Sequence, residues 1–435
     1  MNDDTSSVHG VLVQGTLSRR ALLRAATAGC VWAGMTRLEL QSACAATDDT
    51  RLLSGAIPTG AAHERPISVA GSGDALFATL PQAQWGSAHD SQTIRQTLRR
   101  DAPGYREFGD TGITAVTTAW SGAAFDPING IEYVTGGGHH DSNCNALFAV
   151  NFETGAVKVC VQPSILTPAV VDEMKKSWPA DNPWNSWDKG ISPSYLYPDG
   201  RVGAVHTYGS IWYLQGKVVQ LGHFWTEYDV IRGVQSFTGP VLGHGSPNNL
   251  GVIVGDRLLS LGSKAYDYWG FRQYDTVART ETISEMGVPY SPGSSARYSF
   301  SGSVFACAIG NDVYCVNPTL SVAWSFDVSR VQKTYVAKIL TLKNPWSAPD
   351  TTDLQLNTSA YDAHANLLYI PAKDFSYFLT WNPLTGACGK FSIKRPGLPI
   401  RQANSAYGRL RYYAKRRCLL LVNSVDEPLY YLKLA

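Results

Sequence analysis

The chain has 435 residues, of which 44% are hydrophobic, 17% are charged and 11% are aromatic. Its formal net charge of +2 gives no indication of a nucleic-acid or membrane-surface partner. Gly (40) and Pro (23) are abundant, and so are Trp (12) and Tyr (22). This composition is typical of an aromatic-rich all-β protein with many turns, and no apolar run is long enough to span a bilayer.

The N-terminal segment has the pattern of a bacterial twin-arginine export signal. Arg19 and Arg20 precede a weakly apolar stretch at 25–35, and small residues follow at 42–46. Charge, apolar block and small residues therefore come in the order that such a signal requires. A tail containing an Arg-Arg pair by chance is the alternative. We expect a signal over residues 1–46 and a periplasmic or extracellular protein.

Export would permit disulfides, and one cysteine pair has a suggestive spacing. Cys307 and Cys315 lie at equal distances from Asn311. A hairpin centred on Asn311 would put the two directly opposite each other, where a bridge is possible. Two buried free thiols are the alternative.

The sequence after about residue 110 repeats a four-stranded unit. The clearest copies begin at 124–134 and 360–370, and each consists of a strand, a polar turn and a second strand. A third strand and a second turn follow in each copy, with the turns at 151–155 and 382–386. We recognise six such units, spaced by roughly 50 residues, which is close to the kelch repeat.

Four-stranded units of this kind stack radially as the blades of a β-propeller, and a β-sandwich is the alternative architecture. The last unit, from Tyr407, has room for about three strands, so we expect a strand at 75–80 to complete it and close the ring. Counting the N-terminal material, we expect seven blades, with six or eight as alternatives. The expected domains are the signal at 1–46, a lead-in at 47–110 and the propeller at 111–435.

A loop rich in polar side chains follows three glycines, Gly136 to Gly138. In a blade, the connection between the second and third strands lies on one face of the ring and toward its axis, so this loop would border a central funnel. A His that caps a neighbouring turn and an Asp in an Asx-turn are the alternative. The loop residues that we expect to face the funnel are His139, His140, Asp141, Asn143 and Asn145.

A second group of candidates follows in the next unit. His206 and Tyr208 would point the same way on a strand, either as a proton-transfer pair or as a hydrogen-bonded core pair. His223 occupies the same kind of strand-to-loop position as His139, and His244 could also reach the funnel. No specific metal motif is present, so we expect no cofactor, although a structural metal ion stays open.

The segments 119–126 with 136–139, and 206–208, resemble bacterial kelch-like propeller proteins, as do 404–412 and 422–427 near the C-terminus. The resemblance covers most of residues 75–435. Within that group, the nearest proteins of known chemistry are the propeller polysaccharide lyases that act on ulvan.

The resemblance implies chemical roles for particular residues. Ulvan-type lyases use a His and a Tyr for proton transfer and a basic residue to neutralise the uronate. By motif, His139 and Tyr208 would take the first two roles. The family's neutralising Arg would fall close to His223, so this chain departs from the pattern. Either His223 substitutes for it, or Arg201 or Arg297 reaches in.

We therefore expect an exported, monomeric polysaccharide lyase that cleaves an anionic, uronate-containing glycan by β-elimination. A non-catalytic glycan- or protein-binding kelch propeller is the alternative, in which an aromatic insertion with Trp178, Trp184 and Trp187 would be the main exposed feature. A copper oxidase similar to the galactose-oxidase propellers is a third reading. It needs a Tyr/Cys/His copper site, to which we find no specific match.

Overall fold

The structure is a computed structural model, and it describes residues 77–78, 82–88, 92–109, 111–138, 142–176, 196–221, 224–240, 250–262, 270–287, 303–394, 399 and 404–434. All of these belong to one compact unit, Ala61–Lys176 with Pro183–Ala435. The expected signal at 1–46 lies outside the described residues. Among the helices of the described part, none is long and apolar enough to cross a membrane.

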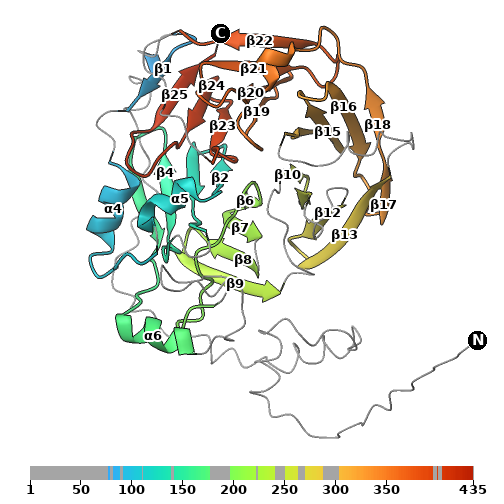
Figure 1. Cartoon of the computed structure of the whole chain (residues 1–435). Helices are drawn as coiled ribbons and strands as arrows, with labels where there is room; N and C mark the ends of the chain where they lie inside the picture. The colour runs from blue at the N-terminus through green and yellow to red at the C-terminus, as the bar shows by residue number, and fades with distance from the viewer. Residues whose placement is uncertain are drawn as a thin grey trace, which may run out of the picture. The chain divides into compact units, whose positions relative to one another are not determined.

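The described strands form six sheets that follow one another around a common axis (Figure 1). Blade 1 contains β2 (Ala123–Asp126), β3 (Ile131–Val134), β4 (Leu147–Asn151) and β5 (Val157–Val161). Blade 2 contains β6 (Ile211–Leu214), β7 (Lys217–Leu221), β8 (Phe224–Asp229) and β9 (Val234–Pro240). Blade 3 contains β10 (Leu250–Val254), β11 (Arg257–Leu261), β12 (Gly270–Asp275) and β13 (Thr280–Gly287), with β17 (Thr334–Val336) added in parallel at its edge.

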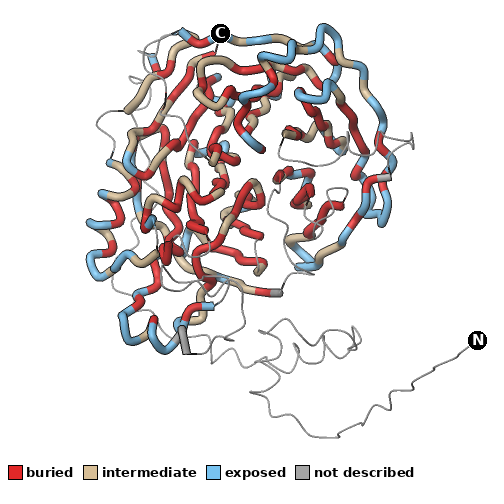
Figure 2. Tube along the Cα trace, viewed as in Figure 1, coloured by how far each residue is buried: buried red, intermediate tan, exposed pale blue. Residues whose placement is uncertain are grey.

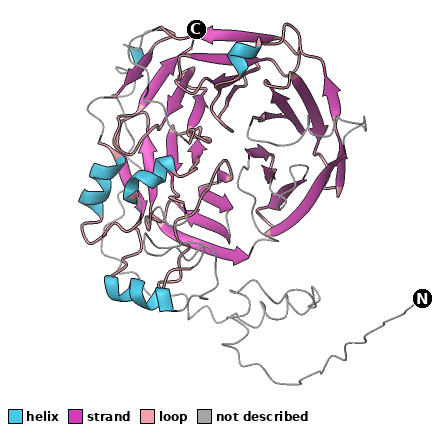
Figure 3. Cartoon of the chain, viewed as in Figure 1, coloured by secondary structure: helices cyan, strands magenta, loops and turns pink. Residues whose placement is uncertain are grey.

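Blade 4 contains β14 (Phe305–Ile309), β15 (Asp312–Asn317), β16 (Val322–Asp327) and β18 (Lys338–Leu340). Blade 5 contains β19 (Ala360–Asp362), β20 (Leu367–Pro371), β21 (Tyr377–Trp381) and β22 (Cys388–Ser392). Blade 6 contains β23 (Leu410–Tyr413), β24 (Cys418–Leu421), β25 (Tyr430–Lys433) and β1 (Trp85–Ser87). Short helices occupy the connections (Figure 3): α4 (Ile94–Asp101), η1 (Gly112–Thr114), α5 (Ala115–Thr118), α6 (Pro168–Lys176) and α7 (Ala348–Thr351).

The fold is therefore an all-β propeller of four-stranded blades, with six blades rather than the expected seven. The six repeat units recognised in the sequence are confirmed. The N-terminal material adds one strand to blade 6 instead of forming a blade of its own, because β1 pairs antiparallel with β25. The strand expected at 75–80 is wrong, since Phe77 and Ala78 are helical and Trp85–Ser87 closes the ring instead.

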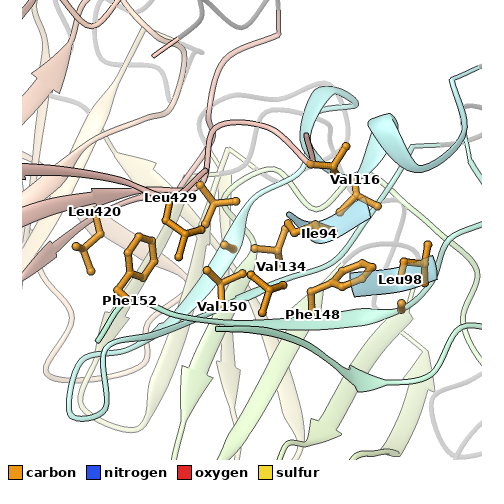
Figure 4. Packing of buried hydrophobic residues seen from close by; sticks show 14 of the residues in the cluster. Ile94, Leu98, Val116, Val134, Phe148, Val150, Phe152, Leu420 and Leu429 are labelled. Carbon is orange, nitrogen blue, oxygen red and sulfur yellow. The ribbon is translucent and has the colours of Figure 1, made fainter. Parts of the chain in front are cut away.

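Hydrophobic clusters lie between the blades, so most strands are buried on both faces (Figure 2). Each neighbouring pair of blades shares one such cluster, including the pair formed by the last blade and the first. At this last seam, Val134 and Phe148 of blade 1 belong to the same cluster as Leu420 of blade 6, with Ile94 and Leu98 of α4 (Figure 4). Because every blade packs against a neighbour on each side, the six blades close the ring without a seventh.

The hairpin between β14 and β15 corrects the expected cysteine geometry. Its loop is Gly310–Asn311, so Cys307 lies opposite Tyr314 and Cys315 lies opposite Ala306. A shift of one residue sends side chains to opposite faces of a sheet. Both cysteines are free and buried, in different inter-blade clusters, and burial raises the pKa of each thiol. The alternative of two buried thiols is therefore correct for this pair.

A buried carboxyl group lies at the seam between blade 1 and blade 6. Glu132 is fully buried, and neither of its carboxylate oxygens has a hydrogen-bond partner among the described residues. Burial raises the pKa of Glu132 well above its ordinary value, although the charges of Arg411 and Arg409 act in the opposite direction. Folding therefore shifts Glu132 toward its neutral form relative to the unfolded chain.

Replacing Glu132 with glutamine is expected to stabilise the protein at neutral pH and to have little effect near pH 4. A carboxyl whose pKa is raised on folding contributes most below its unfolded pKa, and this contribution falls as pH rises toward the folded pKa. Between the unfolded and folded pKa values of Glu132, the free energy of unfolding of wild type falls by at most about 1.4 kcal/mol per pH unit. Urea unfolding of wild type and Glu132→Gln at the two pH values measures it. An equal difference at both pH values would contradict the buried neutral acid.

Candidate functional site

The meander of each blade determines which loops meet. Turns between first and second strands, and between third and fourth strands, lie at one end of the ring, which we call the turn face. Loops from second to third strands, and loops that enter the next blade, lie at the other end, which we call the site face. The segments 119–122, 135–138, 142–146, 204–210 and 404–409 therefore share the site face.

The loops that enter the blades repeat an unusual backbone conformation. Trp120, Tyr208, Asn357 and Tyr407 each lie three residues before the first strand of a blade, and their φ angles are 51°, 46°, 46° and 44°. The left-handed region is rare for bulky residues and is held by surrounding structure where it occurs. The corresponding positions of blades 3 and 4 lie outside the described residues.

The three aromatic residues of this set form a continuous cluster with one histidine. The ring of Trp120 lies 4.8 Å from that of His206, and Nδ1 of His206 lies 3.1 Å from the hydroxyl oxygen of Tyr208. The rings of Tyr208 and Tyr407 meet edge to face, with their centroids 5.4 Å apart. Because Tyr407 comes from blade 6 and Tyr208 from blade 2, the cluster spans blade 1 on the site face. We call Trp120, His206, Tyr208 and Tyr407 the aromatic cluster.

The His206–Tyr208 pair arises from a turn and not from the strand that the sequence predicts. Residues 203–208 form no strand, and the amide of Ser210 donates to the carbonyl of Thr207 over 2.8 Å. Alternation along a strand therefore does not explain why the two side chains meet. The left-handed conformation of Tyr208 brings its hydroxyl to His206.

Blade 1 clamps this turn through its own loop. The amide of Tyr208 donates to the carbonyl of Trp120 over 2.8 Å, and the amide of Gly122 donates to Oγ1 of Thr207 over 2.7 Å. A Cβ atom on Gly122 would lie 1.8 Å from the carbonyl oxygen of Tyr208. Only glycine permits this approach, so the position of Tyr208 depends on Gly122.

The surroundings of Tyr208 bear on its role in proton transfer. A basic Tyr208 would need a lowered pKa, but burial, followed by the neighbouring Tyr407, raises its pKa above the ordinary value. The hydroxyl is therefore protonated at neutral pH, and whether it donates to Nδ1 of His206 or accepts from it is set by the tautomer of the ring. A protonated phenol of this kind is suited to donating a proton rather than abstracting one.

The glycine run before the polar loop is explained by contacts. Gly136, Gly137 and Gly138 have φ angles of 124°, 150° and 73°, and the amide of Gly137 donates to the carbonyl of Val205 over 3.3 Å. The run thus passes beside the segment that leads to His206. The next residues, His139, His140 and Asp141, lie outside the described residues, as do His223, His244 and Arg297.

Two predicted binding residues are part of the scaffold. Asn143 is buried, and its Oδ1 accepts hydrogen bonds from the Tyr105 hydroxyl over 2.6 Å and from the Phe108 amide over 2.9 Å. Asn145 is buried and binds Ser164 through both ends of its amide. Their polar atoms therefore fix neighbouring loops, and both side chains are buried.

Arg201 does not join the aromatic cluster. Its guanidinium binds Asp199 two residues before it, with Nη2 to Oδ2 at 2.7 Å, and also the carbonyl of Gln162. These contacts hold a turn at the outer end of blade 1. Arg201 is therefore occupied locally, and the expectation that it reaches into the site finds no support.

Sequence reasoning missed three contributors: Trp120, Tyr407 and the fully buried Arg409. Arg409 binds the carbonyls of Ser121, Ser405 and Val422, and so ties the loops of blades 6 and 1 together. Burial lowers its pKa to about 10. The sequence does contain a signal for the two aromatic residues. In blades 1, 2 and 6, an aromatic residue stands three positions before the first strand.

Within the part of the chain that the structure describes, no group of three or more His, Cys, Asp or Glu side chains is placed to hold a metal ion. No protein-family model matches the chain, and no curated protein matches it. Among solved structures, the chain is similar to the β-propeller domain of Cps50 (Swd1) from Myceliophteria thermophila. That similarity has 13% identity and a TM-score of 0.31, and it covers 49% of this chain and 61% of the other. The chain thus spans about three fifths of the length of that propeller.

Proposed function

We propose that this protein is an exported, kelch-like polysaccharide lyase that cleaves a uronate-containing glycan by β-elimination. The observation that carries the proposal is the 3.1 Å contact between Nδ1 of His206 and the hydroxyl of Tyr208 on the site face. Tyr208 is held in a left-handed backbone conformation, which is a form of strain that clusters at functional sites. An anionic polysaccharide is the proposed partner.

In the proposed reaction, a base removes the proton at C5 of the uronate, the C4–O bond breaks, and a double bond forms between C4 and C5. Tyr208 donates its proton to the leaving oxygen, because its raised pKa keeps the hydroxyl protonated. His206 orients the hydroxyl through Nδ1. With Tyr208 as the acid, the base is His139, to which the resemblance gives the other proton-transfer role. Neutralisation of the uronate falls to His223 or Arg297. The base returns its proton to Tyr208 through solvent.

A binding propeller without catalysis is the second candidate. Trp120 is the observation that favours it, because this residue is only partly buried and its ring lies beside that of His206. A partly exposed indole suits stacking of a sugar ring. In this candidate His206 and Tyr208 supply only hydrogen bonds to the glycan.

Incubation of the purified protein with a panel of uronate polymers separates the two candidates. β-Elimination creates an unsaturated uronate, so absorbance near the ultraviolet edge should rise with at least one polymer. Tyr213→Phe should turn over that polymer like wild type, because Tyr213 stacks on Tyr133 between blades 1 and 2. A flat trace for wild type on every polymer, with binding retained on a glycan array, would replace the lyase by the binding propeller.

A further inference from the structure

The turn face carries an exposed aliphatic side chain at a hairpin tip in each of four blades. In blades 1, 2, 3 and 5 these are Ile128, Ile231, Val277 and Leu384, with exposed fractions of 79%, 75%, 80% and 55%. We call these four residues the aliphatic tips. Single exposed aliphatic residues are common on protein surfaces, whereas recurrence at the same end of four blades is a patterned feature.

The tips are held rigidly by the turns that carry them. Oδ1 of Asp229 accepts from the amide of Ile231 over 3.0 Å, and Oδ1 of Asp275 accepts from the amide of Val277 over 2.9 Å. The same two-residue spacing joins Asp126 to Ile128 and Asn382 to Leu384. These Asx-turns fix the backbone, so little conformational entropy remains to be lost when a tip binds.

Basic side chains accompany the tips in one sector of the turn face. Arg232 is exposed directly after Ile231, and the turn between β23 and β24 in blade 6 presents exposed Lys415 and Arg417. Lys415 lies 3.3 Å from Glu153, which also pairs with Arg416. The sector of blades 6, 1 and 2 therefore keeps an excess of positive charge beside Ile128 and Ile231. A whole-chain charge of +2 conceals this local excess.

The tips stand on separate blades, so they do not form one continuous apolar groove. A protein partner would have to match every tip, but a fluid lipid layer accepts each side chain independently. Anionic headgroups complement the neighbouring Arg and Lys side chains, each of which adds attraction near a charged bilayer. We infer that the turn face binds the surface of an anionic lipid bilayer, with the aliphatic tips inserted and the site face directed away from the lipid.

Sedimentation of the full chain with vesicles tests this inference. Wild type should pellet with phosphatidylglycerol-containing vesicles and much less with pure phosphatidylcholine vesicles. Ile231→Ser, Val277→Ser and Leu384→Ser together should weaken binding by about tenfold or more, because apolar burial is lost at three tips. The matched control replaces three exposed strand residues, Ile253, Ile283 and Ile339, with serine and should bind like wild type.

Arg232→Gln with Lys415→Gln should abolish the preference for the anionic vesicles. Wild type that stays in the supernatant with both vesicles would overturn the inference, and so would a tip variant that binds as well as wild type. Pelleting without vesicles would identify a second copy as the occupant and would also overturn it. None of the tips belongs to the aromatic cluster, so the result does not depend on whether the protein is a lyase.

Discussion

Replacing Tyr208 with phenylalanine is expected to lower kcat on a uronate polymer by a factor of about 10²–10⁴, the usual contribution of a positioned proton-transfer group. The ring contacts to His206 and Tyr407 do not need the hydroxyl, so the variant should fold and bind like wild type. Initial rates from ultraviolet absorbance, with KM from the same data, measure the effect. A loss in kcat with unchanged KM distinguishes a missing proton donor from a damaged binding site.

The control for this experiment lies in the same blade. Tyr213→Phe removes a hydroxyl from β6 but leaves the aromatic cluster intact, so its kcat should match that of wild type. Equal activity of Tyr208→Phe and wild type would remove Tyr208 from the mechanism. The lyase proposal would then require a different residue as the proton donor to the leaving oxygen.

Replacing Gly122 with alanine is expected to lower the free energy of unfolding by about 3 kcal/mol, the upper part of the usual cost of overpacking. The new Cβ would lie 1.8 Å from the carbonyl oxygen of Tyr208 and 3.0 Å from its carbonyl carbon, and backbone atoms cannot rotate away as a flexible side chain can. The turn at 207–210 must therefore shift. Chemical denaturation measures the loss, and activity should fall with it because Tyr208 moves.

Gly104→Ala provides the matched comparison, since a Cβ there meets nothing within 4 Å. Its free energy of unfolding should stay close to that of wild type. If both glycine variants were equally stable, the clamp between blades 1 and 2 would be less tight than the structure implies. The position of Tyr208 would then need another explanation.

The aromatic cluster depends on hydrogen bonds that run from blade to blade. Asn404 of blade 6 donates to the carbonyl of Thr118, and Arg409 binds the carbonyl of Ser121 in the loop of blade 1. The hydroxyls of Ser210 and Ser260 then join blade 2 to blade 3 over 2.7 Å. Buried, fully used polar groups of this kind restrict a structure to one arrangement. The loops of the site face are therefore coupled, and a change in one is expected to reach its neighbours.

Local sequence by itself determined the repeat. Asp and Asn residues at the hairpin turns, and β-branched and aromatic runs between them, define six four-stranded units. All six are present because turn chemistry and strand alternation depend on neighbouring residues only. The polar loop after Gly138 and the pairing of His206 with Tyr208 were likewise visible as candidates, although the pairing was expected for the wrong reason.

Tertiary structure alone decided which strand closes the ring, how Tyr208 is held and what the asparagines do. The free edge of β25 can pair with more than one segment of the N-terminal region. The segment with Trp85 pairs there, because the buried Trp85 ring packs against Phe375 of blade 5. The conformation of Tyr208 depends on Gly122, which lies 86 residues earlier in the chain and on another blade. The side chain of Asn143 accepts a hydrogen bond from the amide of Phe108, in a segment 35 residues earlier. Such contacts join residues that are distant in sequence, so no local pattern records them.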